Sequence, residues 1–308
     1  MSVIRKALCN YVEMRRGFGL KFDNQQKRLT DFVRFMEQRG AMVVTNKLAF
    51  EWAMQCTDHR PTCALRLADI RGFARYLSAS EPATEVLEVG ILPWPRRTRP
   101  YLYTNAEVLK LMSAALDLRP ADGLRHWTYH CLFGLLAVTG MRISETLALR
   151  RDDVDLEAGI LVVHESKFGK SRLVPVHPTT RASLVDYAEQ RDAHVFPPRS
   201  PYFFVAEQGG KLLHQHVNQV FLKLSRQTGL RGPDDRSGPR IHDFRHSFAV
   251  RTLLIGYRKG LNIDLLLPVL STYLGHAYVR DTYWYLSECP ELMRYAADKL
   301  EQRWGVPS

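Results

Sequence analysis

A proline-rich basic segment, ILPWPRRTRPYLYT at residues 91–104, most constrains how this chain can fold. Pro93, Pro95 and Pro100 lack a backbone N–H and push the residue before each of them towards extended conformations, so no regular helix can run through the segment. It also carries three arginines and shows no helical spacing of apolar residues. The segment therefore predicts two domains joined by a basic linker, with the domains at 1–93 and 104–308 and the linker at 94–103.

The first domain reads as a bundle of helices. Two stretches place apolar residues at helical spacing, and the first of them ends at Gly40. The apolar positions are Leu29, Phe32, Val33 and Met36, and then Leu67, Ile70, Phe73 and Leu77. Many arginines and lysines lie among the remaining positions, which predicts a small bundle with basic residues on its polar faces.

The second domain is predicted to be mainly helical with one β-hairpin. RHWTYHCLFGLLAVTG is apolar on nearly all sides, which predicts a buried central helix ending at Gly140. In GILVVHESKFGKSRLVPVHP, Val162 and Val163 precede a Lys-Phe-Gly-Lys-Ser turn, and Leu173 and Val174 follow it. We therefore expect a mainly α chain with a small β-hairpin or sheet, in which the second domain is α+β.

The charge of the chain limits its partners. The 308 residues include 43 Lys and Arg against 32 Asp and Glu, a formal net charge of +11. A chain this basic favours a polyanionic partner, and nucleic acid is the first candidate. Five cysteines without a CxxC pair, and no apolar run long enough to cross a membrane, favour a cytoplasmic protein with reduced thiols and no membrane partner.

Histidine and arginine gather in IHDFRHSFAV, residues 241–250. His242 and Arg245 lie three residues apart and share one face of a helix, while Asp243 is suited to cap that helix. These groups suit either a metal or a phosphate. Because no HExxH or CxxC accompanies them, a metal site is disfavoured and none is predicted.

Two further stretches carry polar residues with open roles. In TGMRISETLALR, Arg142 suits either a structural pair with Glu145 or a bidentate grip on a phosphate. In YLGHAYVRDTYWYLSE, His276 follows a glycine and Tyr285 comes nine residues later. Tyrosines on such a helix are commonly core or interface residues, so this stretch alone does not predict catalysis.

Taken in order, these motifs resemble the tyrosine recombinase (phage integrase) family, which includes lambda-type integrases, Xer-type recombinases and Cre. The resemblance covers residues from about 100 to 290, and two of its intervals depart from the family: a polar loop before IHDFRH and a long spacer before LGH. The matching residues are Arg142 in TGMRISE, Lys167 in SKFGKSRLVPV, His242 and Arg245 in HDFRH, His276 in LGH, and Tyr285 in DTYWYL. The N-terminal bundle and its linker likewise resemble the SAM-like core-binding domain of the family.

The resemblance implies catalysis without cofactor or metal. Arg142 and Arg245 would clamp the non-bridging oxygens of a DNA phosphodiester, and Tyr285 would attack the phosphorus. His242 would act as general base or proton shuttle, and Lys167 would protonate the 5′-oxygen that leaves. The product would be a covalent 3′-phosphotyrosine bond.

The same resemblance assigns the remaining residues of the site. His276 would hydrogen-bond the scissile phosphate, whereas His246 and Glu145 are expected to be structural, with His246 facing the other side of its helix. Tyr283 competes with Tyr285, and Lys170 competes with Lys167. Contacts to the DNA backbone are expected from Lys170 and Arg172 of the hairpin and from Arg96, Arg97 and Arg99 of the linker.

The implied function is site-specific recombination of double-stranded DNA, for integration, excision or transposition of a mobile element. The implied assembly is a homo-oligomer on DNA, a synaptic tetramer in which the helix after Tyr285 docks on a neighbour, with sister recombinases or accessory proteins as further partners. Two alternatives stay open: a type IB topoisomerase, which shares this chemistry, and a DNA-binding protein that kept the fold without catalysis.

Overall fold

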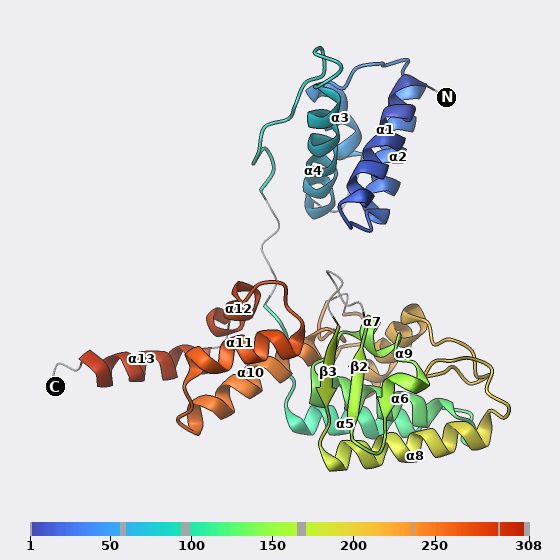
Figure 1. The fold of residues 1–308 in the computed structure, drawn as a ribbon, viewed down its shortest axis with the longest axis vertical. Coiled ribbons are helices and arrows are strands. Elements are labelled where there is room, and N and C mark those ends of the chain that lie inside the picture. Colours follow the sequence, from blue (N-terminus) through green and yellow to red (C-terminus); the bar gives the residue numbers. More distant parts are fainter. Residues whose placement is uncertain are drawn as a thin grey trace. The chain divides into compact units, whose positions relative to one another are not determined.

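The computed structural model describes residues 2–55, 60–93, 99–164, 171–235, 237–288 and 290–304. Contacts divide the chain into two compact units, Met1–Thr98 and Arg99–Ser308. The division falls inside the segment that the prolines mark as a linker. Figure 1 draws the two units and labels their elements.

The first unit is a bundle of four helices around one apolar core. The predicted apolar positions Leu29, Phe32, Val33 and Met36 are all fully buried, together with Ile70 and Phe73. Gly40 follows the second helix with a positive φ of 64°, a conformation that favours glycine. The helices are α1 (Val3–Gly17), α2 (Asp23–Gln38), α3 (Asn46–Met54) and α4 (Arg60–Leu77).

The second unit contains a central helix, as its sequence predicts. Helix α6 packs against α5, α8 and α10, and most of its residues are buried. The helices are α5 (Asn105–Leu116), α6 (Arg125–Thr139), α7 (Ile143–Thr146), α8 (Pro178–His194), α9 (His214–Gln227), α10 (Asp243–Arg258), α11 (Ile263–Leu274), α12 (Arg280–Glu288) and α13 (Pro290–Trp304). None of the helices in the described ranges is long and apolar enough to cross a membrane.

The end of α6 is fixed by a glycine. Gly140 adopts the left-handed conformation, with φ 61°. A Cβ built there would lie 2.6 Å from the ring of Phe248 on α10, so a larger residue would displace that helix. The tight ending brings Arg142 directly to the start of α7.

The predicted β-hairpin is confirmed and gains a short third strand. Strands β2 (Ile160–Val163) and β3 (Arg172–Pro175) pair antiparallel, with Val162 opposite Leu173. Strand β1 (Val154–Asp155), which follows a 3₁₀ turn η1 (Arg151–Asp153), pairs with the other edge of β2. The tip of the hairpin, residues 165–170, lies outside the described residues.

Aromatic packing holds α10 on α6. The ring of Phe244 stacks on Tyr103 with centroids 4.5 Å apart, and it also contacts Phe133 and Phe221. Phe244 is 1% exposed and lies between His242 and Arg245 in the sequence. The main core therefore fixes the first turn of the helix that carries both residues.

We predict that Phe244→Ala lowers the free energy of unfolding of the second unit by about 3–5 kcal/mol. The substitution removes a buried ring and leaves a cavity in the core. Urea denaturation monitored by circular dichroism measures the loss. Leu109→Ala on α5 is the control, since Leu109 is 62% exposed and its loss should cost under about 0.5 kcal/mol. Equal losses in the two variants would contradict this account of the core.

Candidate active site

The site forms around a turn at the end of α11, where Leu274 and Gly275 present backbone carbonyl oxygens. Arg142 donates from Nη2 to the carbonyl of Gly275 at 3.1 Å and from Nη1 to that of Leu274 at 3.5 Å. Arg245 donates from Nη2 to the same Leu274 carbonyl at 2.7 Å and from Nη1 to the carbonyl of Gly140 at 3.0 Å. Two arginines that are about a hundred residues apart thus meet at one acceptor.

Glu145 anchors the first of these arginines. Its carboxylate accepts from Nη1 of Arg142 at 2.6 Å and from the backbone N–H of Arg142 at 3.0 Å. The structural pair that the sequence left open therefore exists. The alternative role of Arg142, a bidentate grip on a phosphate, stays a prediction; its guanidinium reaches the same turn as that of Arg245.

Arg172 occupies the other side of the same carboxylate. It donates from Nη2 to Glu145 Oε2 at 2.7 Å and from Nε to the carbonyl of Tyr273 at 2.7 Å, and its side chain is 9% exposed. Arg172 thus ties strand β3 to Glu145 and to the end of α11, and its expected contact with the DNA backbone stays a prediction.

Arg142 and Arg245 carry like charges close together, and Arg245 is buried. Burial, together with the charge of Arg142, lowers the pKa of Arg245 to about 10. In Glu145, burial raises the pKa, but hydrogen bonds and charge from Arg172 and Arg142 outweigh it, so the net pKa is lowered. With three guanidinium groups around one carboxylate, the cluster carries a net positive charge and suits an anion.

His276 follows the turn and is held as a neutral ring. Its Nδ1 lies 2.8 Å from the hydroxyl of the buried Thr282. Burial lowers its pKa to about 3, with Arg245 and Arg142 adding to the effect. Gly275, with φ 68°, is required beside it because a Cβ there would lie 2.8 Å from the guanidinium of Arg172.

His242 stands at the start of α10, one turn before His246. Burial lowers its pKa and the charge of Arg245 lowers it further, so the imidazole is neutral at physiological pH and able to accept a proton. The expected cap by Asp243 is not formed: Asp243 is the first residue of the helix, His242 occupies the N-cap position, and no described side chain caps it. The Asp243 carboxylate instead accepts the backbone N–H of Arg240, before the helix, at 2.8 Å.

Tyr285 on α12 points into this group. It is 3% exposed, and its ring stacks on His276 with centroids 6.0 Å apart. Burial raises the pKa of its hydroxyl, while the charge of Arg245 and a hydrogen bond with Arg245 oppose the rise. Tyr283 and Tyr278 are 51% and 58% exposed, so the structure brings Tyr285 to the arginines and leaves its competitor on the surface.

His246 lies on the side of α10 opposite to the one expected. Its ring centroid is 4.8 Å from that of His242 and 5.4 Å from that of Tyr285. The expectation that it faces away from the site is wrong, because residues four apart on a helix share a face. That spacing from His242 was the signal in the sequence that could have placed it.

Several predicted residues cannot be placed. Lys167 and Lys170 at the hairpin tip, and Arg96 and Arg97 in the linker, lie outside the described residues, whereas Arg99 is described as the first residue of the second unit. The described residues contain no group of three or more His, Cys, Asp or Glu side chains arranged to hold a metal ion.

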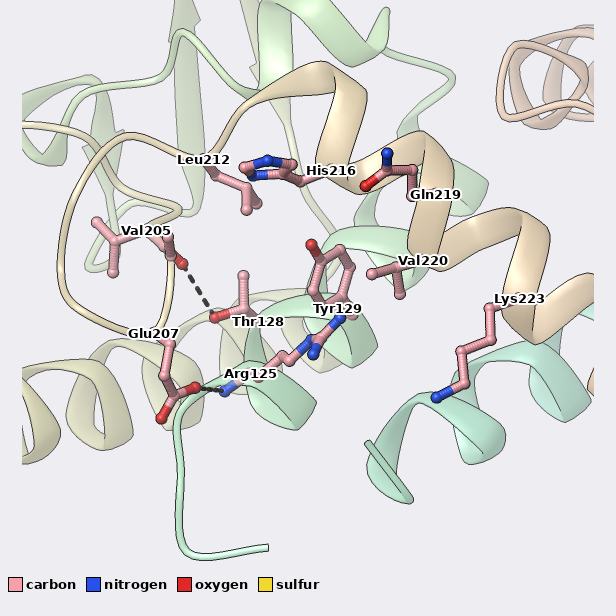
Figure 2. A pocket seen from close by; sticks show the side chains of 11 residues that line it. Arg125, Thr128, Tyr129, Val205, Glu207, Leu212, His216, Gln219, Val220 and Lys223 are labelled. Carbon is pink, nitrogen blue, oxygen red and sulfur yellow. Dashed lines mark hydrogen bonds between the residues drawn. The ribbon is translucent and has the colours of Figure 1, made fainter. Parts of the chain in front are cut away.

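A hollow on the second unit lies apart from Arg142 and Arg245, which do not line it. Figure 2 shows it between the N-terminal turns of α6 and helix α9, with a volume of about 400 Å³. Arg125, Tyr129, His216 and Lys223 line it, and among the described residues that match the family, Arg142, His242, Arg245, His276 and Tyr285, none does. This hollow is therefore separate from the candidate site, whose Arg245 and Tyr285 side chains are buried.

Comparisons with known proteins agree on one family. The Phage integrase family matches residues 102–291 of the chain. The putative integrase/recombinase y4rB of Sinorhizobium fredii is 45% identical over 99% of both chains. The tyrosine recombinase XerD of Mycobacterium tuberculosis is 31% identical over 73% of this chain and 68% of its own.

Solved structures share the fold at low identity. The Tn1549 transposon integrase in complex with transposon right end DNA gives a TM-score of 0.68 at 17% identity, covering 98% of this chain and 99% of that one. XerH site-specific recombinase bound to its palindromic difH substrate gives 0.65 at 18% identity, covering 90% and 78%. These likenesses establish the fold as that of these recombinases.

We predict that Glu145→Gln costs about 3–5 kcal/mol of stability at pH 7, because it leaves the Arg142 and Arg172 charges buried without a counter-charge. The pKa of Glu145 is lowered in the folded state, so its contribution is present at neutral pH and is lost as pH falls below the ordinary carboxyl range. Urea denaturation between pH 3 and pH 7 should show a flatter pH profile for the variant. Glu157→Gln, at an exposed carboxylate, should match the wild type, and a Glu145 variant of wild-type stability would refute the network.

Proposed function

The chain belongs to the phage integrase family, and we propose that it is a site-specific DNA recombinase that uses Tyr285 as its nucleophile. The observation that carries this proposal is the meeting of Arg142, Arg245, His276 and Tyr285 around one turn. These residues come from four separate segments, and burying charged and polar groups together costs free energy, which favours a functional role for the cluster.

The two arginines suit a phosphodiester. Such a group resists attack because it is anionic, and attack adds negative charge to its non-bridging oxygens. Guanidinium groups remain charged even when buried, and their forked donors match two phosphate oxygens. Arg142 and Arg245 would therefore stabilise the pentacoordinate state without a metal, and His276 would add a hydrogen bond.

Tyr285, His242 and Lys167 account for the bonds and protons of the proposed cleavage step. The phenolic oxygen of Tyr285 forms a bond to phosphorus while the bond from phosphorus to the 5′-oxygen breaks. The tyrosine proton passes to the neutral imidazole of His242, and the 5′-oxygen takes a proton from Lys167. The energy of the broken ester is kept in the 3′-phosphotyrosine, and a 5′-hydroxyl of a second strand reverses the step to rejoin DNA.

The relatives favour a role in mobile DNA. One is named a putative integrase/recombinase, and a neighbour in fold is a transposon integrase bound to transposon end DNA. We infer that double-stranded DNA is the partner and that the protein integrates, excises or transposes an element. Strand exchange between two duplexes calls for several protomers, so we infer a homo-oligomer on DNA, in the form of a synaptic tetramer, with accessory proteins as further partners.

Basic residues outside the site would hold the DNA. We propose that Arg96, Arg97 and Arg99 in the linker and Lys170 at the hairpin tip contact the phosphate backbone. Each such contact releases counterions, so affinity should fall steeply as salt rises.

We predict that Tyr285→Phe forms no covalent adduct with a nicked duplex while binding DNA as tightly as the wild type, because it loses only the attacking oxygen. The assay uses pooled duplexes from DNA flanking the gene, with EDTA present, and resolves the protein–DNA adduct on a denaturing gel. Tyr283→Phe is the matched control and should form the adduct at the wild-type rate. An adduct from Tyr285→Phe, or its loss in Tyr283→Phe alone, would assign the nucleophile to Tyr283.

We predict that Lys167→Ala slows cleavage by about 10²–10⁴-fold on an ordinary duplex, because the 5′-oxygen then leaves without a proton. A duplex with a bridging 5′-sulfur at the scissile phosphate should restore the rate, since a thiolate leaves readily unprotonated. Lys170→Ala is the control and should weaken binding without this rescue. If the sulfur substrate rescues Lys170→Ala instead, the general acid is Lys170.

A further inference from the structure

His246 is a buried imidazole that the proposed chemistry does not use. It is 8% exposed, and its Nδ1 is buried without a hydrogen-bond partner among the described residues. Burial lowers its pKa to about 4, so the ring is neutral at physiological pH. A buried polar atom without a partner costs free energy, so its presence calls for an explanation.

The contacts of the ring give that explanation. His246 meets three aromatic rings edge to face, with centroid distances of 4.8 Å to His242, 5.1 Å to Trp284 and 5.4 Å to Tyr285. Edge-to-face packing is a directional contact that fixes ring orientation. The imidazole thus lies between the proposed base on α10 and the proposed nucleophile on α12.

Tyr285 depends on such contacts for its place in the site. His276 stacks on one side of its ring, and His246 and Trp284 meet it edge to face. Without His246, a gap would open between α10 and α12 at the edge-to-face contact that its ring makes with Tyr285. The tyrosine ring could then turn about its side-chain bonds, away from Arg245.

We propose that His246 is a positioning residue that holds the Tyr285 ring in its buried, attack-ready orientation by the plane of its own ring. Nδ1 does not carry this role, because it makes no hydrogen bond among the described residues. The catalytic consequence rests on the proposed function, whereas the effect on the orientation of Tyr285 does not.

The first test measures the exposure of Tyr285 without DNA. Tetranitromethane nitrates exposed tyrosines, and peptide mass spectrometry reports each site, with the half-exposed Tyr283 on the same helix as internal reference. In His246→Ala, nitration of Tyr285 should rise towards that of Tyr283. In His246→Phe, which keeps a planar ring, Tyr285 should stay protected as in the wild type.

Leu253→Ala is the matched control for a general loss of packing. Leu253 is fully buried, lies on α10 two turns after His246, and belongs to the same apolar cluster as Tyr285. All four proteins are compared well below their melting temperatures. Equal nitration of Tyr285 in His246→Ala and the wild type would overturn the proposal, and so would equal exposure in Leu253→Ala and His246→Ala.

The second test measures cleavage by protein already bound to the nicked duplex on which the wild type forms its adduct. A displaced nucleophile should slow His246→Ala by about a hundredfold with an unchanged Kd for DNA, and His246→Phe should restore the rate to within about threefold. A Phe variant as slow as the Ala variant would mean that the nitrogens act and the ring plane does not. An absent wild-type adduct would count against the recombinase function and would leave the nitration result standing.

Discussion

The carbonyl oxygen of Leu274 is the acceptor on which the site depends, because Arg142 and Arg245 both donate to it. Arg142 arrives there from the end of α6, and Arg245 from the first turns of α10. Their shared acceptor fixes the end of α11, which in turn places His276 and the start of α12. Displacing that turn would therefore move both arginines, His276 and Tyr285 together.

The network around Glu145 explains why this turn stays in place. Arg172 on β3 bonds the carboxylate of Glu145 on α7 and the carbonyl of Tyr273 on α11, so the hairpin is tied to both. A movement of strand β3 would therefore displace the turn at the end of α11. The tip that carries Lys167 and Lys170 thus extends from a strand whose base is anchored beside the proposed scissile phosphate.

Much of this fold could be predicted from patterns within short stretches of sequence. The features that escaped prediction depend on very short elements or on residues far apart in the chain. The buried α6, its stop at Gly140 and the pairing of Val162 with Leu173 are set by periodicity and turn chemistry within short windows. Strand β1 escaped prediction because two residues are too few to show alternation. The bond between Arg172 and Glu145 escaped prediction because the two residues lie 27 positions apart in the chain, and a basic residue beside a hairpin tip is usually expected to be exposed.

Within the candidate site, too, the sequence predicted which residues to consider but not how their side chains are oriented. The order of motifs was enough to choose His242, Arg245, His276 and Tyr285, but no motif states which way a ring turns. His246 was expected on the outer face, although its four-residue step from His242 already places the two on one side of α10. The choice of Tyr285 over Tyr283 depended on the family spacing alone until the rotation of α12 buried one and exposed the other.

The manner in which the arginines are held bears on what they can bind. Carbonyl groups at the ends of α6 and α11 carry partial negative charge and accept the hydrogen bonds of Arg245, so this guanidinium is fixed in direction while keeping its net charge. A carboxylate in the same place would fix it equally well but would cancel the field that attracts a phosphate. Glu145 is the carboxylate that the described structure sets against Arg142 and Arg172, and sharing it between the two leaves the cluster cationic. Gly140 and Gly275 make this arrangement possible, since the left-handed turn at each ends a helix with its last carbonyls aimed at the arginines.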